Sequence, residues 1–258
     1  MSSIIDQIKS RFKSGSMNLK LMMVNIGVFV TLLIVAIIGK SFVTGFSPLR
    51  YLEVSSNYMD VLTQPWTIIT YMFSHSLDGI GHLFWNMLLL YFMGNFFESI
   101  LGSKKLLSVY LIGGLAGLVL FILGYNFLPA LSVFNGGVLV GASAAVTAIF
   151  VAIGVYMPNY EIRLLFIPQT FKLIYVVAFF VLLDIIRLQT SIGVADANTG
   201  GWLAHIGGAI FGVVYASQLK KGKNILSGFE KFIDYCVSFF KPGSKLKVKY
   251  SKKKKKNK

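Results

Sequence analysis

Long apolar segments recur along most of the chain and determine its expected architecture. A helix of about 20 apolar residues is long enough to cross a hydrocarbon core roughly 30 Å thick. We interpret six apolar segments as membrane-spanning helices, at approximately residues 19–40, 81–101, 105–125, 137–157, 171–188 and 201–218. The pattern therefore predicts an all-α, polytopic membrane protein built as a six-transmembrane-helix bundle.

Apolar residues outside the central spans form a second pattern. Residues 41–80 are rich in aromatic side chains, which concentrate at membrane–water boundaries, so we expect this segment in or on the outer interface. Residues 225–240 place apolar side chains on one helical face, which predicts an amphipathic helix on the inner leaflet. No small-residue cleavage motif follows the first span, so we expect a retained helix rather than a signal peptide.

Basic residues orient the predicted helices. The chain carries 25 Lys and Arg against 10 Asp and Glu. If both termini face the cytoplasm, every basic residue except Lys40, Arg50 and Arg187 lies on the cytoplasmic side, as the positive-inside rule requires. Membrane topology thus explains the charge, and we expect no nucleic-acid partner. The predicted parts are a cytoplasmic N-terminal segment 1–18, a membrane domain 19–218, and a cytoplasmic amphipathic segment with a basic tail, 219–258, which we expect to attract anionic lipid.

Composition limits the chemistry that the chain can carry. Cys236 is the single cysteine and there are three histidines, which leaves no disulfide framework and no Cys-rich metal site. A site made of the three histidines is a weaker alternative, because no carboxylate or cysteine accompanies them at ligand spacing. We therefore expect neither a metal nor another cofactor.

Polar residues inside the spans are few, and each is a functional candidate because such residues are costly in a membrane. They are His82, Asn86, Glu98, Ser143, Thr147, Asp184 and His205. Ser143 and His205 each lie 15 residues from the cytoplasmic ends of their spans, marked by Pro158 and Lys220, or about 22 Å at the rise of a helix. Asn86 lies at a similar height. We expect the three side chains at one level, roughly 8 Å below the outer face of the hydrocarbon core.

Helical spacing indicates which way these side chains face. His205 shares a face with Gly201, Gly208 and Gly212, and small residues allow a partner helix to approach closely. Its imidazole is therefore expected to face protein. His82 and Asn86 are four residues apart and lie on one face of their span.

The combination of Ser143 and His205 predicts nucleophilic catalysis. A serine hydroxyl is a weak nucleophile until a neighbouring base takes its proton, and a neutral imidazole can do so. No carboxylate is obviously placed as a third member, because the sequence shows no evident link between Asp184 and His205. We therefore infer a Ser-His dyad.

Attack on a peptide carbonyl develops a negative charge on its oxygen, which hydrogen-bond donors stabilise. His82, the Asn86 amide and a backbone N–H near Ser143 are the expected donors. Gly141 would let the backbone approach the reacting carbon.

With these residues assembled, the sequence resembles the rhomboid intramembrane serine proteases of the six-helix bacterial type, over about residues 60–218. FSHSLDGIGHLFWNMLLLYFMGNFFE resembles the signature of the family's second span, in which a His and an Asn assist the oxyanion, matching His82 and Asn86. An earlier family histidine corresponds to His75. Glu98 resembles the family's structural glutamate near the cytoplasmic end.

Two further motifs carry the resemblance. GASA resembles the nucleophile motif GxSG and places the nucleophile at Ser143. AHIGGAIFG matches the signature AHxxGxxxG, with His205 as the base and with Gly208 and Gly212 at a tight helix crossing.

Three positions depart from the family pattern. Ala144 replaces the second glycine of the nucleophile motif, which adds a methyl group beside the serine. Thr147 stands where the family often has an aromatic residue stacked on the histidine, and Phe150 is our suggested substitute. Trp66-Thr67 retains half of a Trp-Arg pair in the first outer loop.

The resemblance implies a protease that cleaves membrane-anchored protein substrates at or just below the outer surface of a bacterial cytoplasmic membrane. It also implies substrate entry past the fifth span, with residues 189–200, which include Gly193 and Gly200, as a moving cap. One alternative is a catalytically inactive relative that binds transmembrane clients. Another is a small transporter or proton path that uses His82, Asp184 and His205.

Overall fold

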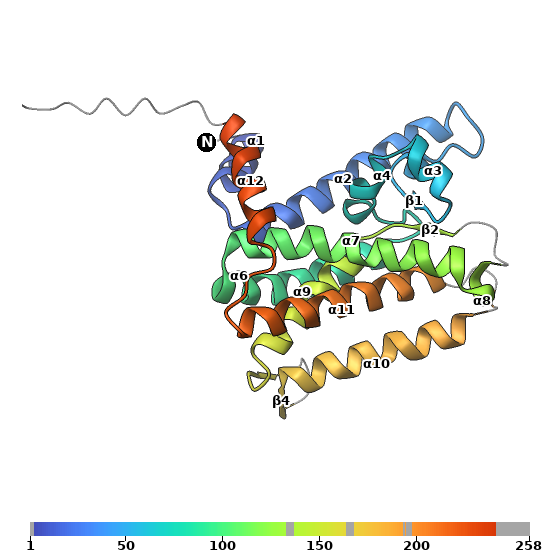
Figure 1. Ribbon diagram of the computed structural model, residues 1–258. Coiled ribbons are helices and arrows are strands. Elements are labelled where there is room, and N and C mark those ends of the chain that lie inside the picture. The colour runs from blue at the N-terminus through green and yellow to red at the C-terminus, as the bar shows by residue number, and fades with distance from the viewer. Residues whose placement is uncertain (1–2, 133–136, 164–167, 193, 195–197, 241–258) are drawn as a thin grey trace, which may run out of the picture.

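The protein is a helical bundle. Its computed structural model describes residues 3–132, 137–163, 168–192, 194 and 198–240. Among these residues, four helices are long and apolar enough to span a membrane: α2 (Met17–Lys40), α7 (Ser103–Phe127), α10 (Leu173–Ser191) and α11 (Thr199–Lys220). A shorter apolar helix, α9 (Ser143–Tyr156), packs against both α7 and α11, which also contact each other (Figure 1). The prediction of an all-α, polytopic membrane bundle is confirmed.

The second predicted span is helical throughout but not uniform. It consists of α5 (Gly81–Leu89), a π-helical turn η3 (Leu90–Gly94) and α6 (Asn95–Leu101). A Cβ atom on Gly94 would collide with the side chain of Asn18 on α2. The glycine thus lets the first two spans approach closely within this wider turn.

The fourth predicted span, 137–157, is wrong over its first six residues. Val138–Leu139 forms a short strand, β2, which pairs antiparallel with β1 (Val54–Ser55) of the outer segment. Gly141 then has a φ of +123°, so the helix cannot begin before Ser143. The apolar pattern of 137–142 reflects burial against the outer segment rather than a helix.

The outer segment folds into short elements: η1 (Pro48–Tyr51), β1, α3 (Tyr58–Thr63), α4 (Thr67–Thr70) and η2 (Tyr71–Phe73). The Trp66 indole donates to the Tyr51 carbonyl at 2.8 Å, and the Thr70 hydroxyl donates to the Leu52 carbonyl at 3.0 Å. These two hydrogen bonds fasten α4 and the residue before it to the end of η1. Beyond it, α8 (Pro129–Ser132) follows α7, and a hairpin of β3 (Glu161–Arg163) and β4 (Thr170–Lys172) joins α9 to α10.

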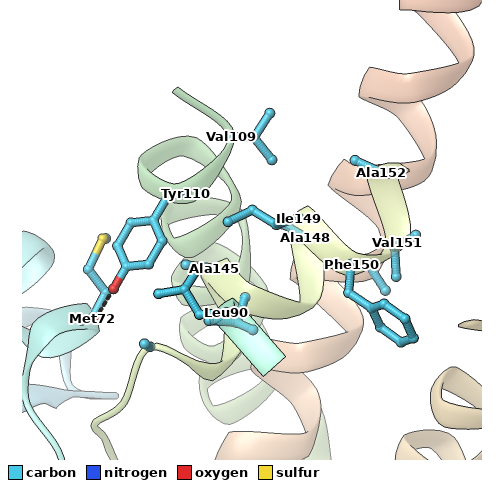
Figure 2. Close-up of a cluster of buried hydrophobic side chains, with 14 of the residues drawn as sticks. Met72, Leu90, Val109, Tyr110, Ala145, Ala148, Ile149, Phe150, Val151 and Ala152 are labelled. Atoms are coloured by element: carbon cyan, nitrogen blue, oxygen red, sulfur yellow. Dashed lines mark hydrogen bonds between the residues drawn. The ribbon is translucent and has the colours of Figure 1, made fainter. Parts of the chain in front are cut away.

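The centre of the core is α9, which is buried along most of its length. Ala145, Ala148 and Ile149 on this helix face Val109 and Tyr110 of α7 (Figure 2). The Tyr110 hydroxyl donates to the Met72 carbonyl at 2.7 Å, which connects α7 to the outer segment. The core therefore links the three central helices to the loop that follows the first span.

At the end of the bundle away from the outer segment, residues far apart in sequence are joined by hydrogen bonds and an ion pair. The Glu98 carboxylate accepts hydrogen bonds from the Met17 and Asn18 amides, at 2.8 and 2.9 Å, and from the Ser103 hydroxyl at 2.6 Å. Lys104 forms a 2.7 Å ion pair with Asp234 of α12 (Ser227–Phe240). Together with α1 (Ile4–Ser14), α12 lies at this end (Figure 1). The proposed basic tail falls largely outside the described residues.

Candidate active site

Ser143 is the first residue of α9, next to an unusual backbone. The amides at the start of a helix have no partner within it, and they create a partly positive end. The Val146 amide bonds to the Ala142 carbonyl at 2.9 Å and closes the first turn. The side chain of Ser143 is half-buried. The serine thus lies where a helix terminus presents donor groups to a developing negative charge.

The His82 ring and the Ser143 hydroxyl both lie near the position that a side chain on Gly141 would take. A Cβ atom on Gly141 would lie 2.7 Å from His82 Cε1, 2.8 Å from His82 Nε2 and 3.8 Å from Ser143 Oγ. Its positive φ is also one that other residues rarely adopt. Glycine is required here both for backbone conformation and for space.

The backbone N–H of Gly141 takes part in the turn before Ser143. Its N–H donates to the Tyr71 carbonyl at 3.0 Å, so this group is already used. That bond instead fixes the turn that precedes Ser143. The amides at the start of α9 are therefore the candidate backbone donors near Ser143.

The expected side-chain donors lie together on α5. The Asn86 amide nitrogen donates to the His82 carbonyl at 2.8 Å, and the second of its two hydrogens has no described bond. His75 is fully buried and meets His82 edge to face, with ring centroids 5.2 Å apart. Burial, followed by the effect of the neighbouring His82, lowers the pKa of His75 to about 3. His75 is thus a neutral ring that supports His82.

A close crossing of α9 and α11 brings the surroundings of Ser143 and His205 together. A Cβ atom on Gly117 of α7 would lie 2.6 Å from the Ala144 Cβ and 2.7 Å from the Ala204 carbonyl oxygen. These two residues are the chain neighbours of Ser143 and His205. One turn beyond His205, a Cβ atom on Gly208 would collide with the Ala144 carbonyl.

The same crossing continues along α11. A Cβ atom on Gly212 would lie 2.7 Å from the Ala148 carbonyl oxygen. Gly208 and Gly212 of the predicted stripe therefore face α9, whereas a Cβ atom on Gly201 would collide with the Asn198 side chain. His205 lies close enough to His82 for an electrostatic interaction.

Asp184 is the site residue that sequence reasoning did not connect. Its Oδ2 lies 3.1 Å from His205 Nδ1, with the two side chains 16% and 15% exposed. The statement that no link joins them is therefore wrong. A signal existed: Asp184 lies four residues from the outer end of its predicted span, near the predicted level of His205.

The His205 ring also has an aromatic neighbour. Trp202 meets it edge to face with centroids 5.3 Å apart, and the Arg187 guanidinium lies over the Trp202 ring at 4.9 Å. Phe150, the neighbour suggested from sequence, packs instead against Phe180 of α10. The hydrogen-bond and ring contacts described for the imidazole therefore come from α10 and from α11 itself.

Comparison with known proteins identifies the architecture that carries these residues. A family profile described as the Rhomboid domain matches residues 62–221. The chain belongs to the rhomboid family. It is also similar to RHOMBOID-like protein 12, mitochondrial, of Arabidopsis thaliana, with 33% identity over 167 residues. The match covers 61% of this chain and 47% of the relative, so the chain spans about half the length of that curated relative.

Within the rhomboid domain, the departure at Ala144 has a local explanation. The Ala144 side chain is 2% exposed, and its Cβ points toward Gly117 on α7. A larger residue at position 117 would collide with this methyl group. The methyl is thus accommodated between helices, on the side of the backbone that faces α7.

Two further predictions concern ligands and access. Among the described residues, no group of three His, Cys, Asp or Glu side chains could hold a metal ion. The proposed cap, 189–200, is described in part: Gly200 is the second residue of α11, whereas Gly193 and residues 195–197 lie outside the described residues.

Proposed function

We propose that this rhomboid-family chain is an intramembrane serine endopeptidase. It would hydrolyse peptide bonds in or near the transmembrane segments of membrane-anchored proteins. Ser143 would be the nucleophile and His205 the general base. The observation that carries the proposal is the α9–α11 crossing at Ala144 and Gly208, which brings a serine at a helix start to a histidine-bearing face.

Each step assigns one task to each group. His205 would take the Ser143 proton as Oγ bonds to the substrate carbonyl carbon. The resulting imidazolium would give that proton to the leaving amine as the C–N bond breaks. His205 would then take a proton from a water molecule as that water attacks the acyl-enzyme, and it would return the proton to Ser143 Oγ as the acid product leaves.

The developing oxyanion would be stabilised by groups already near Ser143. The free amides at the start of α9, the His82 ring and the second Asn86 hydrogen are the candidates. In known proteases, removal of one such donor costs about 3 kcal/mol of transition-state stabilisation. Gly141 would contribute through its turn and through the space that it leaves for His82.

The catalytically inactive alternative rests on Ala144 and Thr147. Burial of the Ala144 methyl against Gly117 supports catalysis, because the added group does not need to occupy the space in front of Ser143. The name of the curated relative, a rhomboid-like protein, leaves this choice to experiment.

A proton path is the second candidate, because titratable groups form a connected row. Asp184 contacts His205, His205 interacts with His82, and His82 meets His75. The buried His75, with its pKa of about 3, argues against a relay that needs this ring to accept protons near neutral pH. Proton flux into liposomes that survives Ser143→Ala would favour this function.

The proposed setting is a membrane with both termini on its cytoplasmic side. The shared end of α1 and α12 supports termini on one side (Figure 1). The curated relative is named as mitochondrial, so the bacterial cytoplasmic membrane is part of this proposal. Protease protection of tagged termini in sealed vesicles would test the orientation.

A fluorescent fluorophosphonate tests the proposed function without knowledge of the substrate, because this probe labels activated serines. Purified protein in detergent is compared with Ser143→Ala, His205→Ala and, as a matched control, Ser99→Ala, which changes an exposed serine at the other end of the bundle. We expect labelling of the wild type and of the Ser99 variant, and none of the other two. Equal labelling of the Ser143 variant would reject the proposal.

A further inference from the structure

Asp184 stands out because the proposed dyad chemistry does not use it. It lies on α10, whose other side chains near this level are largely apolar. A carboxylate inside a membrane span is costly, and such groups usually pair with another polar group. The described partner of Asp184 is His205 Nδ1 at 3.1 Å.

We propose that Asp184 is a positioning residue that turns the Ser-His dyad into a three-residue system. This proposal rests on the proposed protease function. Its carboxylate accepts the Nδ1 hydrogen of His205, which leaves Nε2 without a hydrogen and available to Ser143. The carboxylate stays ionised throughout, while Nε2 takes the serine proton and returns it to the leaving amine.

The orientation of the ring supports this assignment. A histidine held only by packing can exchange its two nitrogens or move its hydrogen between them. Here, Trp202 meets the ring edge to face and Asp184 holds one nitrogen, so both its plane and its tautomer are fixed. The orienting carboxylate, Asp184, comes from α10, whereas the proposed base, His205, is on α11.

Other charged and titratable groups around His205 do not replace this contact. On α10, the Arg187 guanidinium lies over the Trp202 ring, and Trp202 in turn contacts the imidazole. On α5, His82 faces Gly141 and is backed by His75. Among these groups, Asp184 is the carboxylate in contact with His205.

The position of Asp184 on α10 has a mechanistic consequence. Much of this helix is exposed in the bundle, and its few buried residues lie mainly near its start. Any movement of α10 away from α11 would separate Asp184 from His205. The base would then be correctly oriented only while α10 is docked.

The test compares Asp184→Asn, Asp184→Glu and a control on the same helix, Phe179→Leu. The control changes a side chain that is 57% exposed and leaves the contacts of Asp184 and Arg187 intact. Nitrogen-15 NMR of histidine-labelled protein in micelles reports which ring nitrogen carries the hydrogen, and the chain has only three histidines to assign. Cleavage of a membrane-anchored reporter gives kcat and KM in parallel.

We expect the Nδ1–H form of His205 in the wild type and in Phe179→Leu, and its loss in Asp184→Asn. The same Asn variant should lose kcat by about 10²-fold to 10⁴-fold with KM roughly unchanged, by analogy with the orienting carboxylate of serine-protease triads. Asp184→Glu should restore part of kcat. Unchanged kcat, or an Nε2–H form in the wild type, would overturn the proposal.

The NMR arm separates this proposal from the proposed function. A wild type that cleaves no reporter and binds no fluorophosphonate rejects the protease function and, with it, the catalytic role of Asp184. A wild type that cleaves normally but shows no change in tautomer or kcat on Asp184→Asn rejects the role of Asp184 alone.

Discussion

Helices α9 and α10 follow one another in sequence but are held in the bundle in different ways. In α9, ten of the 14 residues are buried, and the helix meets α7 and α11 through glycine and alanine backbones. In α10, Leu173, Val176, Val177 and Ser191 are the buried residues, and large apolar side chains face outward. Its polar contacts with α11 include Asp184 with His205, Arg187 with Trp202 and, at the helix end, the Thr199 hydroxyl donating to the Ser191 carbonyl.

The contrast shows how one site can combine rigidity with access. Ser143, the proposed nucleophile, begins a helix that cannot shift without collisions between backbones, so its position is fixed by shape. The proposed orienting carboxylate sits on a helix held by directional contacts of modest strength, which can form and break.

The largest effect is expected where α11 crosses α9. Gly208→Val would drive a side chain into the Ala144 carbonyl, and a backbone group cannot move aside cheaply. We expect a loss of about 3 kcal/mol or more of unfolding free energy, together with loss of fluorophosphonate labelling. Unfolding in mixed detergent micelles measures the first quantity.

The control for this variant is Gly27→Val, which changes a helical glycine of α2 with no atom within 4 Å of its added Cβ. It should fold and retain labelling. Equal damage from both variants would show that the crossing is not the cause.

A smaller effect is expected at the contact between α7 and α9. A Cβ atom on Gly113 would collide with the Ala148 Cβ, and its next neighbour is 3.5 Å away on Phe211. Gly113→Ala should cost about 1–3 kcal/mol of unfolding free energy. Ala148→Gly, added to it, should restore much of the loss, and a purely additive double mutant would contradict this packing.

The attachment of α10 is expected to be weaker. Arg187→Ala removes the contact with the Trp202 ring, worth about 0.5–1 kcal/mol at exposed sites. Hydrogen exchange should accelerate in α10 and stay unchanged in α9. Equal acceleration in both helices would mean that α10 is part of the same cooperative unit as the core.

The smallest effect is expected on the outward face of α10. Phe179 is 57% exposed in the bundle, so Phe179→Leu should change the unfolding free energy by less than about 0.5 kcal/mol. Phe121 of α7 is fully buried, and Phe121→Leu should cost about 1 kcal/mol or more. Similar values for the two variants, again from micelle unfolding, would remove the distinction between core and periphery.

The sequence predicted the elements that depend on apolar length and helical spacing. The six apolar segments all contain helices, and the small-residue stripe of His205 faces a partner helix, as the contacts of Gly208 and Gly212 with α9 show. Such features follow from local pattern, because a helix repeats every 3.6 residues and a bilayer sets its length.

Features that depend on contacts between distant segments were not predictable from local pattern. The start of α9 was misplaced because β2 pairs with Val54 and Ser55, more than 80 residues earlier. The Gly141 amide could not be known to bond to Tyr71. Asp184 was left unassigned because spacing along a chain does not show which faces of two separate helices meet.

Glu98 gives the bundle a built-in order of assembly. The first turn of α2 has a local cap, since the Leu19 amide donates to the Ser16 hydroxyl as soon as both residues exist. Its stronger carboxylate partner for the Met17 amide is 81 residues further along the chain. At typical rates of synthesis this carboxylate emerges roughly 4–16 s later. During translation, the first helix therefore enters the membrane with a provisional start, which becomes fixed when the second helix arrives.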